Sequence, residues 1–411
     1  MNKFPLQYYL LLAATGFVAS LLLTPLVRKL ALATGRIAVP KDTRWHKKET
    51  ALLGGVAIFG ATLGVWIGAD WLSGWRNLGS SYLPMILCAA AMFSIGLADD
   101  ILNMDPQHKI AAQIVITSIL MIFGFRVEWT GSNTANLFIS IFWIVGITNA
   151  FNLLDNMDGL SAGVAAIAAA FLFLTNYVHP DPSTSAVLLL ASGFFGALLG
   201  FLIFNFNPAS IFMGDAGSLF IGFVMGCLTA AGNVERISGG SAGHLLWVIA
   251  IPIFILFVPI LDTGFVSFMR KLFRRPISQG GRDHSSHRMV AIGFSEKKAV
   301  LVLYAFSGVS GCLTLSFHYL SVGPTLVLIT LYLLFVVFFW VYLARVKVYP
   351  EESLLANNGL GAFTPVVVQL AYRRRIFEVF LDLVLVTVAY YTAYLLRFEG
   401  TGTVYYLIGD D

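Results

Sequence analysis

Long hydrophobic stretches alternate with short polar connections along almost the whole 411-residue chain. Twelve of these stretches are long enough, or nearly so, to cross about 30 Å of hydrocarbon as helices of about 20 residues. Their centres lie near Ala14, Gly60, Ala91, Ser118, Ile141, Ala168, Leu190, Met225, Ile255, Gly308, Leu331 and Val388. The pattern predicts an all-α fold, a polytopic helical bundle that is integral to a membrane.

A change of composition after the eleventh stretch divides the chain. Residues 347–375 are polar and rich in Asn, Gly and Pro. We therefore predict a membrane domain over residues 1–345, a cytosolic linker over 346–375, and an appended transmembrane helix with a short tail over 376–411. The first stretch has no small-residue cleavage site after a short apolar core, which favours a retained helix over a signal peptide.

Composition supports the membrane class, since 58% of the residues are hydrophobic, 12% are charged and the mean hydropathy is +0.80. Cys88, Cys227 and Cys312 each fall inside a hydrophobic stretch. Their positions fit neither a disulfide framework nor the spacing of a metal site.

The basic residues set an orientation. Of the 26 Lys and Arg residues, 21 fall on one side when the stretches are counted alternately from the amino terminus. The positive-inside rule places these loops in the cytosol and the amino terminus outside. Most of the charges serve topology, and a few are expected to attract lipid phosphate and nucleotide. We expect membrane lipid, and no nucleic acid, as a partner.

Seven aspartates lie at the ends of hydrophobic stretches, all on the predicted cytosolic side. An ionised carboxylate near a bilayer is costly unless it faces water, a cation or a partner. The aspartates therefore predict one shared polar site, with Mg²⁺ as the simplest cation to gather them. They are Asp99, Asp100, Asp155, Asp158, Asp215, Asp262 and Asp283.

The first of four polar segments carries Asp99 and Asp100, followed by Lys109 and Gln113. Adjacent carboxylates repel one another, so the pair favours a metal, the lysine or a shared proton as partner. The alternative is two interfacial charges that mark a helix end.

In the second segment, Asn152, Asp155 and Asp158 recur every three residues before Gly159. If the segment is helical, the three side chains share one face. A calcium loop is the competing interpretation, but the glutamate that such a loop requires is absent.

The third segment places Asn205 before Asp215, which lies between Gly214 and Gly217 at the start of a hydrophobic stretch. The glycines leave room for a bulky polyanion, and helix-start amides bind phosphate oxygens. A plain N-terminal cap by Asp215 or Ser218 is the alternative.

The fourth segment contains Arg282, His284, His287 and Arg288. Two histidines three residues apart, flanked by arginines, suit phosphate binding. Zinc is disfavoured because neither a cysteine nor a third histidine is near in sequence. An earlier loop adds His46, for which an ordinary interfacial position is the alternative.

Taken in order, the motifs G-x-x-D-D, K-x-x-x-Q, N-x-x-D-x-x-D-G, N-x-x-P-A-x-x-F-M-G-D-x-G-S, P-x-x-D-T and D-H-x-x-H resemble the polyprenyl-phosphate N-acetylhexosamine-1-phosphate transferase family. The resemblance covers residues 5–343. It implies a bundle of about eleven helices, to which the twelfth is appended, in a bacterial inner membrane with the active site facing the cytosol.

The resemblance also implies a reaction. N-acetylhexosamine 1-phosphate passes from a UDP-sugar, with UDP-N-acetylglucosamine as the expected donor, to undecaprenyl phosphate, and UMP is released. This would be the first membrane step of cell-surface polysaccharide synthesis. One alternative is the peptidoglycan enzyme that uses UDP-MurNAc-pentapeptide, which usually carries a triple-histidine run where Ser285 and Ser286 interrupt it here. The other alternative is a lipid-linked sugar transporter, whose polar groups would lie near the bilayer midplane.

Residue roles follow from the same resemblance. Mg²⁺, for which Mn²⁺ can substitute, is expected on Asp215 and Asp100. The expected catalytic residues are Asp99, Asp100, Lys109, Asp155 and Asp158, with Asp99 and Asp100 handling the lipid phosphate and Lys109 pairing with phosphate oxygens. The expected substrate-binding residues are His46, Asn152, Asn205, Arg282, His284, His287 and Arg288.

The appended segment, residues 373–398, is similar to the first membrane helix of membrane-anchored nucleotide-sugar dehydratases. It indicates a fusion or a partner in the same pathway. Small-residue spacings such as Gly196 with Gly200, or Gly60 with Gly64 and Gly68, allow close helix approach. Packing within one bundle is favoured there, and a homodimer interface is the alternative.

Overall fold

The computed structural model describes residues 4–38, 49–72, 79–178, 185–231, 242–273, 281, 283–346 and 386. Eleven of the twelve predicted stretches fall on helices, and the twelfth lies outside the described residues apart from Val386. The helices are α1 (Leu6–Ala33), α2 (Gly54–Leu72), α3 (Gly79–Leu102), α4 (Pro106–Ile122), α5 (Asn133–Leu154), α6 (Leu160–Val178), α7 (Ser185–Asn205), α8 (Gly214–Ala231), α9 (Ala242–Ile255), α10 (Phe257–Leu272), α11 (Ser285–Ala291), α12 (Glu296–Tyr319) and α13 (Val322–Ala344).

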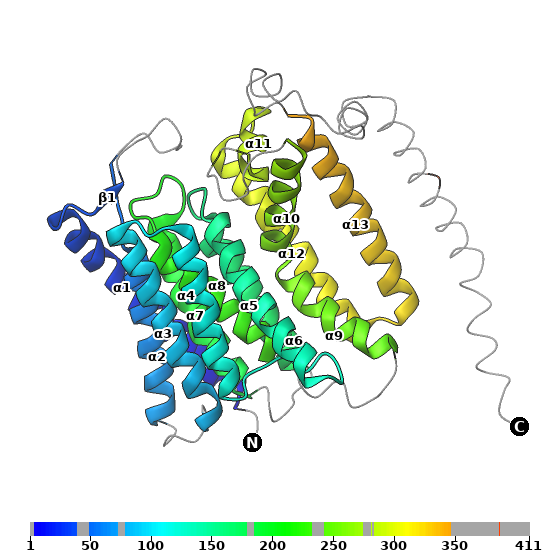
Figure 1. Ribbon diagram of the computed structural model, residues 1–411, viewed down its shortest axis with the longest axis horizontal. Coiled ribbons are helices and arrows are strands. Elements are labelled where there is room, and N and C mark those ends of the chain that lie inside the picture. Colours follow the sequence, from blue (N-terminus) through cyan, green and yellow to red (C-terminus); the bar gives the residue numbers. More distant parts are fainter. Residues whose placement is uncertain are drawn as a thin grey trace, which may run out of the picture.

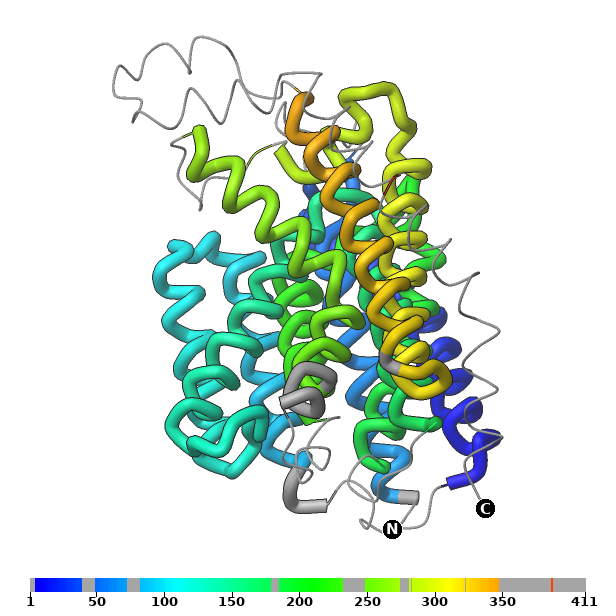
Figure 2. The backbone as a smooth tube through the Cα atoms, turned by 90° about the vertical axis from the view of Figure 1, so that its right-hand side faces the viewer, coloured from blue at the N-terminus to red at the C-terminus, as the bar shows by residue number. Residues whose placement is uncertain are grey.

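The helices form one bundle, as the prediction required (Figures 1 and 2). By length and composition, eight described helices can each cross a membrane, or nine spans if α9 and α10 count as one. The polytopic all-α membrane class is therefore confirmed. The proposed division at residues 345 and 375 stays a prediction, because most of the segment beyond residue 346 lies outside the described part.

The ninth span is broken, which the hydrophobic pattern did not predict. Helices α9 and α10 meet at 79°. Pro252 lies inside α9, and Pro259 lies in the first turn of α10. A proline has no N–H to donate to the residue four positions earlier, so Pro259 cannot continue the helix from Ile255. Because of the break, α10 runs in a different direction from α9. Asp262 and Arg270 both lie on α10.

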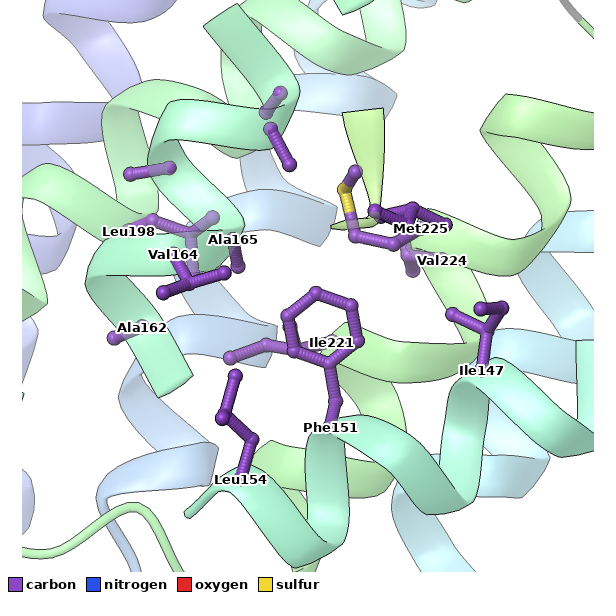
Figure 3. Packing of buried hydrophobic residues seen from close by; sticks show 14 of the residues in the cluster. Ile147, Phe151, Leu154, Ala162, Val164, Ala165, Leu198, Ile221, Val224 and Met225 are labelled. Carbon is purple, nitrogen blue, oxygen red and sulfur yellow. The ribbon is translucent and has the colours of Figure 1, made fainter. Parts of the chain in front are cut away.

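Helix α8 is the centre of the bundle, with every residue from Ala216 to Ala230 buried. Figure 3 shows Phe151 and Leu154 of α5 directed at α8 and α6, where they meet Ile221 and Val164. A Cβ added at Gly222 of α8 would lie 2.6 Å from Cα of Thr148. Glycine thus lets α5 and α8 approach closely, as is common between membrane helices.

The glycines of α7 also pack inside the bundle. A Cβ at Gly196 would lie 1.9 Å from the carbonyl oxygen of Ala13, and one at Gly200 would lie 2.4 Å from that of Phe17. Close packing of α7 on α1 confirms the intramolecular interpretation for this pair. Gly64 and Gly68 have no described neighbour within 4 Å of a built Cβ.

A small hairpin, absent from the prediction, anchors the loop before α8. Strand β1 (Ile37–Ala38) pairs antiparallel with β2 (Thr50–Ala51). The amide of Phe212 donates to the carbonyl of Ala51 at 2.8 Å, and the amide of Gly55 donates to that of Met213 at 2.8 Å. These bonds fix the approach of the chain to α8, at the upper face of the bundle in Figure 1.

Candidate functional site

Five polar side chains meet where α3 and α5 end and where α4 and α8 begin. We call Asp99, Asp100, Lys109, Asn152 and Asp215 the carboxylate cluster. Nζ of Lys109 lies 2.7 Å from Oδ2 of Asp99 and 2.6 Å from Oδ2 of Asp215. Nδ2 of Asn152 donates to Oδ1 of Asp215 at 2.8 Å. The prediction that these residues share one site is supported by direct contact.

Glycine spacing explains why the cluster assembles. A Cβ at Gly96 would lie 2.3 Å from the carbonyl oxygen of Asp215, so α3 can cross the start of α8 only because Gly96 has no side chain. Asp99 and Asp100 follow one turn later and therefore reach the first turn of α8. Gly214 has a φ of +70° and faces the carboxylate of Asp100. The left-handed conformation there favours glycine.

Asp100 caps α8 from a neighbouring helix. Its Oδ1 accepts from the amide of Asp215 at 2.8 Å, and its Oδ2 accepts from the amide of Ala216 at 2.9 Å. The alternative of a cap by Asp215 or Ser218 is therefore wrong about the residue, because Asp100 supplies the cap. Carboxylates at helix starts are stabilised both by these bonds and by the helix dipole.

The carboxylate cluster has three acidic groups and one cationic group. Asp99 is buried, with 9% of its side chain exposed, whereas the side chains of Lys109 and Asp215 are 16% and 31% exposed. Oxygens of two carboxylates already converge on one cation, the ammonium of Lys109. Carboxylate oxygens suit Mg²⁺, which usually needs only one or two of them and completes its shell with water. The donor set therefore fits Mg²⁺, although no group of three His, Cys, Asp or Glu among the described residues is arranged to hold a metal ion.

A second group, the histidine cluster, comprises Asp262, Arg270, Asp283, His284 and His287. Arg270 donates from Nε to Oδ2 and from Nη2 to Oδ1 of Asp283, both at 2.7 Å. Nδ1 of His284 lies 2.8 Å from Oδ2 of Asp262. Oδ1 of Asp262 accepts from the amide of Ser285 at 2.9 Å and from the hydroxyl of the same residue. All five side chains are buried.

His287 is the member of this cluster with the clearest electrostatic signature. Burial lowers the pKa of His287 to about 4, and the neighbouring His284, whose ring centre lies 5.7 Å away, acts in the same direction. Nε2 of His287 lies 3.4 Å from the carbonyl oxygen of Asn156. The imidazole is therefore neutral near pH 7.

The turn after α5 joins the two clusters. Asn152 contacts Asp215, whereas four residues later Oδ1 of Asn156 accepts from Ser286 Oγ at 2.7 Å. Asp155 lies between them at the end of α5. Asp158 turns elsewhere, since its Oδ2 accepts from the amide of Ala209 at 2.9 Å. Residues 152–158 therefore do not present one shared catalytic face as predicted. Asn152 belongs to the carboxylate cluster, whereas Asp158 holds the loop before α8 in place.

Two residues predicted to bind substrate are used inside the protein. Oδ1 of Asn205 accepts from the amide of Gly159 at 3.2 Å, and its Nδ2 donates to the carbonyl of Ile211 at 2.9 Å. Arg288 is fully buried, and its Nη1 donates to the carbonyls of Leu343 and Val346 at 3.2 and 3.0 Å. Both positions differ from the substrate-facing ones that the sequence predicted, because each side chain satisfies backbone groups.

His46 and Arg282, both predicted to bind substrate, lie outside the described residues. The sequence did not predict three features of the two clusters: Arg270, Asn156 and the pairing of Asp262 with His284. A signal for Arg270 did exist, because it follows Asp262 by eight residues and so falls near the same helical face. Nothing in sequence, however, linked that face to residues 283–285.

The fold and its two clusters define an integral membrane protein with an acid-rich polar site at one face of a helical bundle. The pattern of glycosyl transferase family 4 matches residues 82–233. A probable undecaprenyl-phosphate N-acetylglucosaminyl 1-phosphate transferase of Bacillus subtilis is 34% identical over 309 residues, covering 70% of this chain and 80% of that protein. The chain belongs to this family of polyprenyl-phosphate N-acetylhexosamine-1-phosphate transferases.

Two further relatives show the range of the family. The decaprenyl-phosphate N-acetylglucosaminephosphotransferase of Mycobacterium tuberculosis is 30% identical over 335 residues, covering 74% of this chain and 81% of that protein. A phospho-N-acetylmuramoyl-pentapeptide-transferase of Limosilactobacillus reuteri is 31% identical over 230 residues, covering 51% of this chain and 70% of that protein.

Proposed function

We propose that this protein transfers N-acetylhexosamine 1-phosphate from a UDP-sugar to undecaprenyl phosphate and releases UMP, with UDP-N-acetylglucosamine as the donor. The Bacillus subtilis and Mycobacterium tuberculosis relatives, of which the chain covers about four fifths, are named for N-acetylglucosamine phosphate transfer to polyprenyl phosphates. The proposed setting is a bacterial inner membrane, with the site open to the cytosol, as the first membrane step of cell-surface polysaccharide synthesis.

The observation that carries the proposal is the convergence of Asp99 and Asp215 on Lys109 at a partly open helix mouth. In the proposed reaction an oxygen of the lipid phosphate attacks the β-phosphorus of the donor. The bond from that phosphorus to the oxygen of UMP breaks, and UMP leaves with the electron pair. Two anions must meet for this, and a lysine held between carboxylates offers them a positioned cation.

Mg²⁺ is the proposed cofactor, with Mn²⁺ as a substitute. Asp215 would be the principal ligand. Asp100 would be the second, since each of its oxygens retains one lone pair beside its bond to an α8 amide. When bound, the ion would offset the repulsion between the two phosphates and stabilise charge on the transferring group.

The other cluster residues act around that centre. Asn152 orients Asp215 through its hydrogen bond to Oδ1, and Lys109 holds Asp99 and Asp215 at a fixed separation. Asp99 is proposed to act as the base that accepts a proton from the lipid phosphate. Asp155 is proposed to support nucleotide binding. His284 and His287 lie on the far side of the 152–158 turn, where the donor's diphosphate or sugar would contact His284.

The peptidoglycan donor UDP-MurNAc-pentapeptide is a second candidate, favoured by the Limosilactobacillus reuteri relative. The enzyme that uses this donor usually carries histidines where this chain has Ser285 and Ser286. Here Ser285 donates to Asp262 and Ser286 donates to Asn156, so both hydroxyl groups point into the protein. A transporter is disfavoured. One pair among the described helices is broken, but the carboxylate cluster lies at the ends of α3 and α5 and the starts of α4 and α8.

Product identity tests the proposal. Purified protein given undecaprenyl phosphate, Mg²⁺ and UDP-N-acetylglucosamine is expected to release UMP and form a lipid-diphosphate sugar. An ordinary glycosyltransferase would release UDP, and a transporter would release neither. Labelled UMP is expected to exchange into the UDP-sugar only when the lipid is present.

A donor panel in the same assay assigns the sugar. UDP-N-acetylgalactosamine and UDP-MurNAc-pentapeptide are the informative competitors. UMP release with the pentapeptide donor alone would overturn the donor assignment. Folded protein that releases no UMP with any donor would overturn the reaction itself.

A further inference from the structure

Asp262 makes an unusual set of contacts for a residue outside the carboxylate cluster. The side chain is only 2% exposed, and its two oxygens meet three donor groups from two consecutive residues of one segment. Oδ2 contacts Nδ1 of His284 at 2.8 Å, while Oδ1 receives the amide and the hydroxyl of Ser285. This arrangement pins the start of α11 to the middle of α10.

The chemistry of these donors fixes the proton on His284. A backbone amide can only donate, so Oδ1 must accept, and an ionised carboxylate accepts at Oδ2 as well. Nδ1 of His284 must then carry a proton. In the neutral ring Nε2 is left as the free acceptor, and Nε2 has no hydrogen-bond partner among the described residues. The tautomer of a histidine is commonly set in this way by the bond that its other nitrogen makes.

A neighbouring ion pair anchors the same segment to α10. Arg270, eight residues after Asp262 on α10, binds the carboxylate of Asp283 with two bonds of 2.7 Å. That pair already holds the residue next to His284. Anchoring of the segment therefore does not by itself require Asp262 to contact an imidazole.

We propose that Asp262 is a positioning residue for His284. It holds the proton on Nδ1 and sets the plane of the ring, so that Nε2 is the nitrogen offered to the diphosphate or sugar of the donor. The inference rests on the proposed function for the identity of that ligand. The tautomer and its dependence on Asp262 stand independently of it.

The substitution Asp262→Asn gives a sharp test, because it keeps the shape but exchanges one oxygen for an NH₂ group. If the amide oxygen stays on the Ser285 amide, the NH₂ group faces Nδ1 and forces the proton to Nε2. The opposite orientation sets NH₂ against the amide of Ser285, which also donates. We therefore expect a reversed tautomer at His284.

Nitrogen-15 spectra of histidine-labelled protein at pH 8 to 9 read the tautomer directly, with the His284→Gln variant assigning the signal among the seven histidines. The wild-type signal is expected to show a protonated Nδ1, and Asp262→Asn a protonated Nε2. A wild-type ring protonated at Nε2 alone would overturn the proposal, even if the variant failed to fold.

Kinetics supply the second readout. Asp262→Asn is expected to lower kcat for UMP release by about 10-fold to 100-fold, the range seen when a metal-bound histidine loses its outer partner. The KM for undecaprenyl phosphate should be unchanged. In the His284→Gln background, Asp262→Asn should cost less than twofold, because a residue that acts through His284 has nothing left to act on. Additive losses would overturn the proposal.

Arg270→Lys is the matched control. It weakens the bidentate bond to Asp283 and is expected to lower the melting temperature without moving the proton on His284. If Arg270→Lys reversed the tautomer as Asp262→Asn does, the effect would belong to anchoring of the segment, and the proposal would fall. If wild-type protein made no UMP while its tautomer matched, the proposed function would fail and the role of Asp262 would remain.

Discussion

The carboxylate cluster and the histidine cluster contain similar residue types but balance their charges differently. The first contains three carboxylates but only one ammonium, that of Lys109, which contacts Asp99 and Asp215, and the side chain of Asp215 is 31% exposed. In the second, Arg270 pairs with Asp283 and His284 with Asp262, and these side chains are at most 5% exposed. Unbalanced charge at an open mouth suits a site that binds ions, whereas a buried pair of opposite charges such as Arg270 with Asp283 holds a segment in place.

The largest expected effect comes from removing charge at the open cluster. Asp215→Asn should lower UMP release by about 10³-fold, because it removes one of the two carboxylates that converge on a cation, and groups aimed at developing charge contribute on this scale. Asp105→Asn is the matched control, since Asp105 is 82% exposed on the same face. Its rate should stay within twofold of wild type. Comparable losses in both variants would remove the distinction between the two carboxylates.

The buried cluster should respond in stability. Arg270→Met removes the two hydrogen bonds that Arg270 donates to the buried carboxylate of Asp283, and breaking one side of a buried pair costs about 3–5 kcal/mol of unfolding free energy. The double change Arg270→Met with Asp283→Leu should recover much of that loss, as no charge is then stranded. Unfolding in detergent, followed by temperature, measures both. A single variant that loses less than about 1 kcal/mol would show that the pair is solvated.

Acid should weaken the histidine cluster through His287. Its pKa is lowered from 6.5 to about 4 in the folded protein, so the unfolded chain takes up a proton first as the pH falls. Stability from the neutral ring is complete above about pH 6.5 and is lost between there and about pH 4, by about 3 kcal/mol at most. His287→Gln should flatten this part of the unfolding profile. An identical acid slope in the variant would contradict the assignment, and His108→Gln, at a 75% exposed histidine, serves as control.

The smallest expected effect distinguishes the parts played by neighbouring aspartates. Asp100→Ala removes the cap of α8 and should cost about 1–2 kcal/mol of stability, whereas Asp100→Asn keeps one acceptor and should cost less. Asp99→Asn leaves the cap intact and should change stability less than Asp100→Ala. Equal stability losses at both positions would mean that the cap is not what Asp100 contributes.

Much of the fold follows from the sequence because hydrophobic length is a local property. The stretches centred on Ala14 to Leu331 lie on helices, and alternate counting gathers the aspartates at one face. The break between α9 and α10 was missed because composition alone does not reveal direction. Pro252 and Pro259 were its signal. The β1–β2 hairpin was missed because two-residue strands leave no periodic pattern.

The sequence predicts which residues gather at the site better than it predicts what each of them does there. Asp99, Lys109, Asn152 and Asp215 meet as expected, since each follows a helix end on the same side. Asn205 and Arg288 instead satisfy backbone carbonyls and amides, and Asp100 caps α8. Such roles depend on which backbone groups arrive from distant helices, and that in turn depends on contacts such as the one between Gly96 and Asp215. The metal ligands, Asp155 as a nucleotide contact and the twelfth helix remain predictions.

The turn after α5 has a consequence for substrate length. Asn152 reaches the carboxylate cluster and Asn156 reaches the segment that carries His284 and His287, with three residues between them. A chain segment of four residues spans at most about 14 Å even when fully extended. This short segment limits the distance between the two clusters. A ligand that contacts both must therefore have a matching distance between its two anionic ends, because a longer linkage would miss one cluster when bound at the other. Selection by length can thus accompany selection by charge.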